Sequence, residues 1–511
     1  MKQINHICYV ALVALSASCT NGFLEEDPDN RLEINTLKKA NELLVYASNE
    51  GSYAFLEQMT DNVSYIADNM HLSGLDDEIF NWKESLNEDQ DGPIYFWNNG
   101  YYAIAQANAV LSRIDELEGD EAYKKHIKGE ALLFRAYNHF MLVNIFAMPY
   151  SSATLTSQGI PYVEELETNL NTKYTNNTIG EVYEKIERDM LDGLSLIDDS
   201  YIREAPKYHF NKKAALAFAS RFYLWTGNNE KCIDYSTQML GSAPSQYIRN
   251  YSLLFNAGGS AAAGVAFINT AEKSNLLVAR RETLYSLRYD AKDRLSTSQF
   301  QSIFLLNILG SSGNARALIA YYGNSSYTCV RLAKNYEYFR RTSLSSNIGY
   351  PYRIDVLFRG EEVLLNRAEA YSNLGKTDEG IADLEILLKA RYLDDLSFLG
   401  DFAIWVNYYD IIEEVAGLDE AGVLADLIER ERRREFMEEG IRWFDIRRLG
   451  LTVSRANGNV LTANDSRKAV AIPELARESL GIGIGENSET ASERLNPQSP
   501  TPGLLELINN N

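Results

Sequence analysis

The histidines of this 511-residue chain lack the spacing of a metal site or a catalytic centre. Outside the N-terminal segment they are scattered singly, at His71, His126, His139 and His209. The sequence contains no H-E-x-x-H of a zinc protease, no G-x-S-x-G of a serine hydrolase and no Walker loop. Carboxylates are plentiful, but none stands out as a glycosidase pair. We therefore expect a protein that is not an enzyme and that carries no cofactor.

One acidic turn has part of the spacing of a calcium-binding loop. Asn87, Asp89, Asp91 and Gly92 stand at the first, third, fifth and sixth positions of an EF-hand loop. The twelfth position should supply a bidentate glutamate, but Asn98 stands there, so the loop lacks its main ligand. The pattern predicts an ordinary acidic turn, and bound calcium is the lesser alternative.

The composition indicates an acidic globular protein. The 49 Lys and Arg against 71 Asp and Glu give a net charge of −22 and a pI near 4.8, which argues against nucleic-acid binding. An apolar fraction of 45% with a charged fraction of 23% is typical of a chain with a folded core. The unusual count is 32 Tyr, more than Phe and Trp together. Tyrosine joins a flat apolar face to a polar tip, which suits wet binding surfaces as well as helix cores.

The N-terminus has the features of an export signal followed by a lipid anchor. Residues 1–18 place a lysine before an apolar run that is too short to span a membrane. The letters SASC then resemble a bacterial lipobox, so we expect residues 19–40 to consist of a lipidated Cys19 and an acidic tether. No later apolar run reaches the roughly 20 residues of a membrane helix. Cys232 lies in a helical pattern and is expected to be a free thiol, although a disulfide with Cys329 stays open.

Helix-period spacing of apolar residues dominates the rest of the chain. It predicts helices over residues 102–117, 128–146, 179–197, 361–374 and 377–392. We predict one domain over residues 41–511. Its helical repeats are expected at about 95–146, 179–240, 359–392 and 424–450, with an insertion of loops and short strands at about 241–352.

Two helical hairpins repeat each other. Residues 217–240 align without a gap with residues 365–388, with Tyr and Gly in matching places before the turn. Gly375 suits a helix C-cap and Thr377 the next N-cap. Both segments follow the tetratricopeptide logic, in which a hairpin cannot bury its apolar face alone. We therefore expect the hairpins to stack into one solenoid-like body.

The most specific string is the charged run ERERRREFMEEGIRWFDIRRLG at residues 429–450. Its spacing predicts a helix whose charges pair one turn apart, with Arg434 facing Glu438. Gly440 then breaks or bends the helix. A solvated helix face alone would not need the RWFD that follows the glycine, so we expect a structural clamp in which Arg and Asp pair across helices.

At these residues the sequence resembles a known family. ERRREFMEEGIRWFDIRRLG is similar to the C-terminal signature of SusD/RagB-like outer-membrane nutrient-binding lipoproteins. Three other strings resemble the family in the same order: YYAIAQANAVLSRI (101–114), KGEALLFRAYNHFMLVNIFAMPY (128–150) and RGEEVLLNRAEAYSNLG (359–375). The resemblance implies a mainly α fold, a superhelix of tetratricopeptide-like hairpins with loops and short strands packed on one side. It also implies a non-catalytic lipoprotein that faces the cell surface from the outer membrane.

The resemblance also implies the ligand class and the partner. Such proteins capture glycans, or sometimes peptides, and pass them to a SusC-like TonB-dependent transporter. An oligosaccharide is therefore the expected ligand, a peptide is the runner-up, and membrane contact is expected through the lipid anchor. Two alternatives from other classes stay open: an anchored hydrolase, which would turn over a polymer, and a scaffold that binds only proteins.

The family signatures fall on scaffold helices, so the ligand site is sought in the loops. A sugar ring stacks its C–H groups on an aromatic face, and its hydroxyls need polar side chains beside that face. The predicted ligand-binding residues are Asn81 and Trp82 in one loop, and Tyr321, Tyr322, Asn324 and Tyr327 in the insertion. Local packing of the non-helical layer is the alternative for each of them.

The remaining aromatic residues are expected to serve the core. Tyr285 and Tyr289 are spaced as a pair that packs along a helix. The other tryptophans lie in helix-like stretches, at Trp97, Trp225, Trp405 and Trp443.

Overall fold

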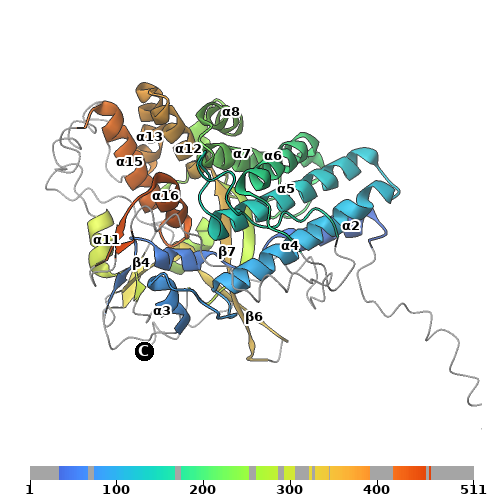
Figure 1. Ribbon diagram of the computed structural model, residues 1–511, viewed down its shortest axis with the longest axis horizontal. Coiled ribbons are helices and arrows are strands. Elements are labelled where there is room, and N and C mark those ends of the chain that lie inside the picture. The colour runs from blue at the N-terminus through green and yellow to red at the C-terminus, as the bar shows by residue number, and fades with distance from the viewer. Residues whose placement is uncertain are drawn as a thin grey trace, which may run out of the picture.

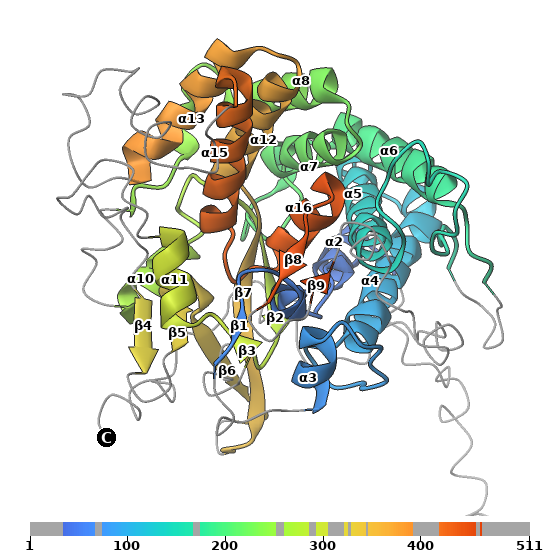
Figure 2. The same ribbon diagram turned by 60° about the vertical axis from the view of Figure 1, so that its left-hand side comes forward.

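A curved row of helices forms the body of the molecule. The structure, a computed structural model, describes residues 34–66, 74–166, 174–251, 260–285, 293–304, 321–324, 329–343, 346–391, 418–455 and 460–461. The body consists of α2 (Leu37–Leu44), α4 (Pro93–Arg113), α5 (Glu121–Phe146), α6 (Ile179–Leu196), α7 (Lys212–Trp225), α8 (Asn229–Leu240), α12 (Gly360–Asn373), α13 (Thr377–Arg391), α15 (Glu420–Glu435) and α16 (Ile441–Leu449). From α4 to α8 each helix packs on the next, and α8 then packs on α12. Figure 2 shows the resulting arc, from α4 and α5 to α13 and α15.

Strands and short helices lie on one side of this arc (Figures 1 and 2). The largest sheet has the order β2–β7–β6 and is antiparallel throughout. Its strands are β2 (Asn275–Glu282), β6 (Glu337–Arg341) and β7 (Gly349–Arg359). The last residue of β7 immediately precedes α12, so the sheet is joined directly to the helical body. The mainly α fold with short strands on one side, predicted from the sequence, is confirmed.

The smaller elements are short. The strands are β1 (Ser64–Tyr65), β3 (Asp293–Arg294), β4 (Tyr321–Asn324), β5 (Cys329–Leu332), β8 (Val453–Ser454) and β9 (Val460–Leu461). The helices are α3 (Gly74–Phe80), α10 (Ser260–Phe267) and α11 (Thr297–Phe304). The 3₁₀ turns are η1 (Val45–Ala47), η2 (Ala54–Met59), η3 (Ile114–Glu116), η4 (Asp199–Tyr201), η5 (Pro244–Tyr247) and η6 (Ala333–Asn335).

Apolar periodicity locates the long helices well, but some of their ends differ from the prediction. The helix predicted from residue 102 begins at Pro93, where a proline in the first turn supplies a fixed φ and lacks only an N–H that would be unpaired anyway. The helix predicted from residue 128 begins at Glu121. Asp120 is its N-cap, because the Asp120 side chain accepts from backbone N–H groups of the first turn. The predicted helix at 179–197 matches α6 within one residue.

Glycine permits one tight turn and one close helix crossing. Gly375, with φ +69°, ends α12 in the left-handed region as predicted, whereas Thr377 is the first residue of α13 rather than its cap. At the crossing of α5 and α6, a Cβ at Gly193 would lie 2.7 Å from the carbonyl oxygen of Gly129. The two backbones can approach this closely only because neither residue has a side chain.

The helical body encloses one large hydrophobic core. Trp97, Trp225 and Trp443 are buried in it, as predicted, whereas Trp405 lies outside the described residues. Cys232 and Cys329 are both buried and form no disulfide, which confirms the free thiol expected at Cys232. In the described part of the chain no helix combines the length and the apolar character needed to cross a membrane. Cys19 and the signal segment lie outside the described residues.

The charged run at 429–450 forms a clamp of buried ion pairs. Arg432 lies 3.3 Å from Asp445 and donates to the Asn366 side chain at 2.7 Å, so the pairing across helices is confirmed. The predicted Arg434–Glu438 pair is wrong, because α15 ends at Glu435 and Arg434 pairs instead with Glu431 at 2.6 Å. The break between α15 and α16 has two left-handed residues, Glu438 and Gly440.

Candidate functional site

Four short strands from distant parts of the chain form one layer, called the strand layer below. It runs in the order β1, β3, β5, β4. β1 pairs with β3, and β5 pairs with β4. Just past β3, Ser296 bridges to Cys329 of β5, and the Val330 N–H donates to the Leu295 carbonyl at 2.9 Å. The segment at 321–324, predicted to bind ligand, therefore belongs to the same layer as Ser64 and Tyr65.

The helix that carries the other predicted residues lies beside this layer. α3 packs against β3 and against η2. Asp76 in α3 is buried, accepts from the Gln58 side chain at 2.8 Å, and lies 4.0 Å from Arg294 of β3. Asn81 and Trp82 follow the end of α3 and so lie near β3, whereas the predicted residues of 321–324 lie on β4, at the other end of the strand layer.

Trp82 is held rigidly and stays half-buried. Its backbone has φ +54°, a conformation that bulky residues rarely adopt and that is often found at ligand sites. Its indole Nε1 donates to the Met59 carbonyl at 3.0 Å, and the Arg455 guanidinium lies 4.2 Å from the ring centroid. Arg455 also lies 3.6 Å from the centroid of the Phe80 ring. Arg455 therefore covers one face of the indole, Met59 takes its polar edge, the side chain also packs against the hydrophobic core, and part of it stays exposed.

Asn81 is engaged locally. Its amide donates to the Asp77 carbonyl and carboxylate, both at 2.9 Å. The Asp77 carboxylate also pairs with Lys83 at 2.9 Å. Asn81 therefore shapes the loop that carries Trp82.

The insertion residues are placed by backbone register. Tyr321 stands opposite Leu332, Tyr322 opposite Arg331 and Asn324 opposite Cys329. Tyr327 lies outside the described residues. Tyr285, expected on a helix, instead follows β2 in a turn and is buried, with the Arg294 guanidinium 4.4 Å from its ring centroid. Its predicted partner Tyr289 is outside the described part of the chain.

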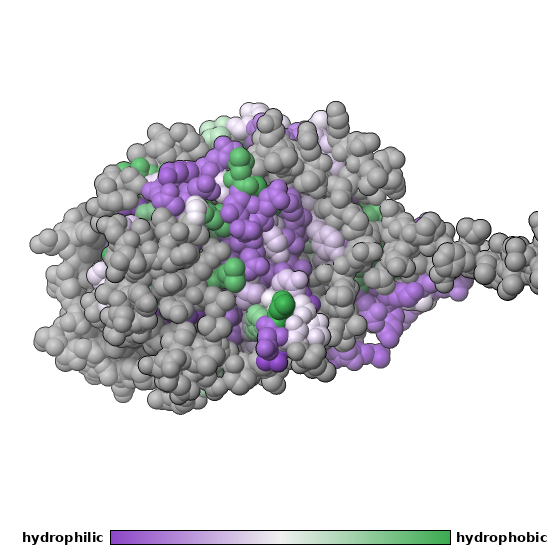
Figure 3. Space-filling model, turned by 90° about the horizontal axis from the view of Figure 1, so that it is seen from below, coloured by the Kyte–Doolittle hydropathy of each residue, from purple (hydrophilic) through white to green (hydrophobic). Residues whose placement is uncertain are grey.

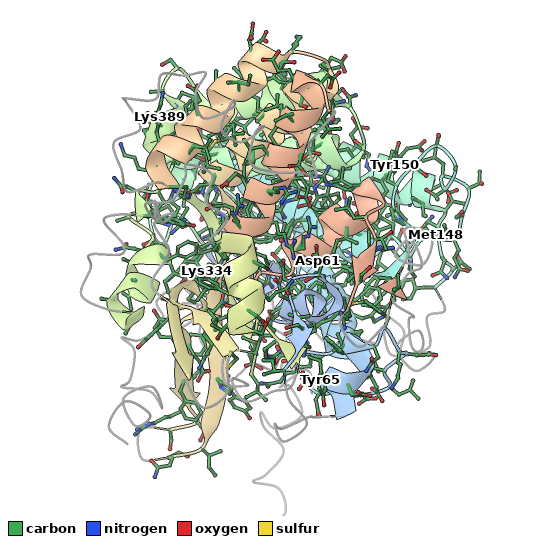
Figure 4. All side chains as sticks on the ribbon, turned by 90° about the vertical axis from the view of Figure 1, so that its left-hand side faces the viewer. Asp61, Tyr65, Met148, Tyr150, Lys334 and Lys389 are labelled. Atoms are coloured by element: carbon green, nitrogen blue, oxygen red, sulfur yellow. The ribbon has the colours of Figure 1, made fainter. Side chains whose placement is uncertain are left out.

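Tyr65 is an aromatic residue of the strand layer that sequence reasoning missed. It is 39% exposed and pairs in register with Asp293. Figure 4 places Tyr65 low in the view and Asp61 above it. Asp61 contacts α15 and α16, which carry the C-terminal charged run and are called the signature helices below. The alternation of a two-residue strand is too short to detect, so no sequence signal could have identified Tyr65.

The signature helices contact the strand layer at its β1 end. Arg442 donates to both carboxylate oxygens of Asp61, at 2.9 and 2.8 Å. Arg433 lies 3.3 Å from the same carboxylate and donates to the Asn62 side chain at 2.8 Å. Burial alone would raise the pKa of Asp61, but Arg442 and Arg433 outweigh it and lower the pKa to about 2. The carboxylate therefore stays charged and ties the segment before β1 to α15 and α16.

The break between α15 and α16 holds the layer at a second point. The Glu438 carboxylate accepts from the backbone N–H of Leu332 at 3.0 Å and from the Asn335 side chain at 2.8 Å. On the other side of the break, the Gly440 N–H donates to the Glu57 carboxylate at 2.9 Å. Two left-handed residues thus orient one group toward β5 and one toward the segment that leads to β1.

The acidic turn that resembles a calcium loop has a structural use. The Asn87 side chain accepts from the Asp89 N–H at 2.7 Å, which makes an Asx turn. Asp91 accepts from the Thr283 hydroxyl, and from the Leu284 N–H at 2.6 Å, and so fastens the end of β2. Among the described residues no group of three or more His, Cys, Asp or Glu is arranged to hold a metal ion.

The arrangement is suited to binding. A fixed indole and a partly exposed tyrosine provide flat apolar surfaces, and amide and charged side chains lie near them. The described surface seen from below is mainly hydrophilic with small hydrophobic areas (Figure 3). Such a mixed surface fits a ligand that has both C–H faces and hydroxyl groups.

Two family models match most of the chain. One, described as starch-binding associating with outer membrane, matches residues 22–224, and the SusD family model matches residues 283–478. The SusD-like protein P2 of Formosa agariphila is 23% identical over 499 residues, which cover 87% of this chain and 90% of that protein.

Solved structures have the same fold. A SusD superfamily protein from Bacteroides thetaiotaomicron is 20% identical, with a TM-score of 0.62, over 88% of this chain and 99% of its own. A SusD-like carbohydrate binding protein from Bacteroides vulgatus is 20% identical, with a TM-score of 0.61, over 92% of this chain and 99% of its own. A laminarin-binding SusD-like protein is 17% identical, with a TM-score of 0.54, over 86% of this chain and 94% of its own. From these matches and the ordered sequence signatures, the chain belongs to the SusD family.

Proposed function

We propose that this protein captures a glycan oligomer at the cell surface and delivers it to a SusC-like TonB-dependent transporter, without catalysing a reaction. The observation that carries the proposal is the half-buried Trp82, fixed by Met59 and Arg455 at the edge of the strand layer. A rigid aromatic surface binds a sugar ring without first losing conformational entropy. Members of the family are known as binding proteins, and one structural neighbour binds laminarin.

Localisation and anchoring follow from the same family membership. We place the protein on the outer face of the outer membrane, held by lipid on Cys19. The acidic tether after Cys19 would let the domain move relative to the bilayer while it stays attached. If the tagged protein is purified, recovery of a TonB-dependent transporter encoded beside it would support the delivery step. Recovery of the same amount of transporter in a control purification without the tagged protein would contradict it.

Affinity electrophoresis in gels that contain laminarin or starch tests the capture step. We expect retention of the wild type in one of the glycans, and roughly three- to tenfold weaker binding after Trp82→Ala, the cost of one stacking contact. Tyr322→Ala tests the insertion strand in the same gels. Tyr350→Ala is the matched control, because Tyr350 is 47% exposed but lies on β7, outside the strand layer.

The outcomes separate the candidate functions. Glycan retention that both Trp82→Ala and Tyr322→Ala leave unchanged would keep the function and reject this site. Binding of peptides instead of glycans would replace the ligand class. Release of reducing ends from laminarin by the purified protein would refute the non-catalytic role.

A further inference from the structure

The helical body contains a second aromatic surface, in a cleft far from the strand layer. The cleft has a volume of about 540 Å³, within the range of small-molecule sites. Its walls come from α2, from the first turns of α5 and from the loop that contains η4. In Figure 1 α2 lies toward the right of the view, whereas α3 and β4 lie toward the left.

Three nearly parallel rings line this cleft. Tyr201 lies 5.2 Å from Tyr123 and 5.8 Å from His126, with interplanar angles of 20° and 27°. Tyr123 and His126 are 6.3 Å apart and 14° from parallel. Rings on opposite faces of Tyr201 would be separated by two stacking distances, about 7 Å or more. Tyr123 and His126 therefore cover the same face of Tyr201, whose half-buried side chain also lines the cleft.

The Tyr201 ring is held in place before any ligand arrives. Asp120 caps α5 by accepting from the N–H groups of Ala122 and Tyr123, at 2.8 and 3.2 Å. The second oxygen of the same carboxylate accepts from the Tyr201 hydroxyl at 3.4 Å. The loop is fixed from the other side, because the Asp198 N–H donates to Nδ1 of the buried His126 at 3.3 Å.

The polar groups around the rings favour a neutral, hydroxyl-rich ligand. Lys38 and Arg203 face the cleft together with Glu42, Asp120 and Glu204, so neither an anion nor a cation is selected. Within the described part of the chain, the side chains of Asn41, Arg203 and Glu204 make no hydrogen bond. They are therefore able to donate to and accept from ligand hydroxyls. The lining residues belong to helices and loops, so an extended peptide finds no strand edge to pair with.

From these observations we infer that the cleft at Tyr201 is a second saccharide-binding site, independent of the strand layer. A sugar ring stacks on the opposite face of Tyr201, and Asn41, Arg203 and Glu204 bond its hydroxyls. The inference rests on the proposed function, because it assumes that the protein meets glycans. Two separated sites on one chain would hold a long polymer more tightly than a short oligomer, since the second contact becomes intramolecular.

The test compares four forms of the purified protein: wild type, Tyr201→Ala, Tyr201→Phe and Tyr235→Ala. Phenylalanine keeps the ring and should bind as the wild type does. Tyr235 is the matched control, because it stacks on Tyr223 at 5.3 Å and 8° on the same helical body but does not line the cleft. In laminarin and starch gels we expect Tyr201→Ala to weaken retention by roughly three- to tenfold, with no change for Tyr235→Ala. Thermal melting checks that each variant is folded.

Calorimetry with short laminarin and starch oligosaccharides gives the number of sites. The expected stoichiometry is two oligosaccharides per wild-type chain, and each of Tyr201→Ala and Trp82→Ala should weaken a different one of the two sites by roughly three- to tenfold. One oligosaccharide per wild-type chain, with retention unchanged in Tyr201→Ala, would overturn the second site and leave the proposed function intact. Absence of wild-type retention in every glycan gel would refute the proposed function, and the second site with it.

Discussion

Replacing Asp61 by Asn removes the charge that ties the signature helices to the segment before β1. Arg442 and Arg433 lower the pKa of Asp61 from its ordinary 3.8 to about 2 against the effect of burial. One pKa unit corresponds to about 1.4 kcal/mol, so the ion pairs stabilise the folded state by about 2 kcal/mol at neutral pH. Because 21% of the side chain is exposed to screening water, this value is an upper estimate. We expect Asp61→Asn to lower the free energy of unfolding by about 1–2 kcal/mol at pH 7.

The pH dependence distinguishes charge from packing. The folded pKa of Asp61 lies below the unfolded one, so its stabilisation is complete above about pH 5 and is lost as the pH falls toward 2. Urea unfolding of wild type and variant at pH 7 and at pH 2.5 measures both ends of this range. The control is Asp77→Asn, whose exposed pair with Lys83 should contribute less than about 0.5 kcal/mol. A loss that is the same at pH 7 and pH 2.5, or no larger than in the control, would refute the electrostatic clamp.

Three further predictions concern the helical body. Gly375→Ala should lower the free energy of unfolding by about 1 kcal/mol and so lower the melting temperature, because the φ of Gly375 is +69°. The control is Gly74→Ala, which should change the melting temperature little because a Cβ there meets open space and φ is not positive. Equal shifts in the two variants would contradict the turn geometry. Burial raises the pKa of Cys232 to about 12, so iodoacetamide at pH 8 should label this thiol only in urea, and labelling of the folded protein would be the contrary result. Burial lowers the pKa of His139 to about 3, so this residue stabilises the fold fully above about pH 6.5 and progressively less as the pH falls toward 3. Its imidazole NMR signals should not shift between pH 8 and 5, and a titration in that range would disprove its burial as a neutral ring.

The helical body could be predicted because its physics is local. Apolar residues recur with the period of a helix, and the glycine at position 375 indicates the turn that follows α12. The support of the candidate site could not be predicted, because it depends on contacts between distant residues. Trp82 is covered by Arg455, and Asp61 is held by Arg442, and no pattern within either segment announces these partners.

The wrong prediction of an Arg434–Glu438 ion pair has the same origin. A spacing of four residues places Glu438 beside Arg434 only if the helix continues, but α15 ends at Glu435 and the chain turns left-handed. Glu438 is therefore free to bond β5 instead of its neighbour in sequence. Local rules describe the helix correctly and fail at the point where the chain leaves it.

The two hydrogen bonds made at the break between α15 and α16 bear on how the protein unfolds. Strands of two to four residues have little stability of their own and would normally open many times before the whole protein does. Here the N–H groups of Leu332 and Gly440 are bonded to the buried carboxylates of Glu438 and Glu57. The strand layer and the helical arc should therefore behave as one cooperative unit in native-state hydrogen exchange. These two amides would then exchange only when the helical body itself unfolds, at the slowest rate in the molecule.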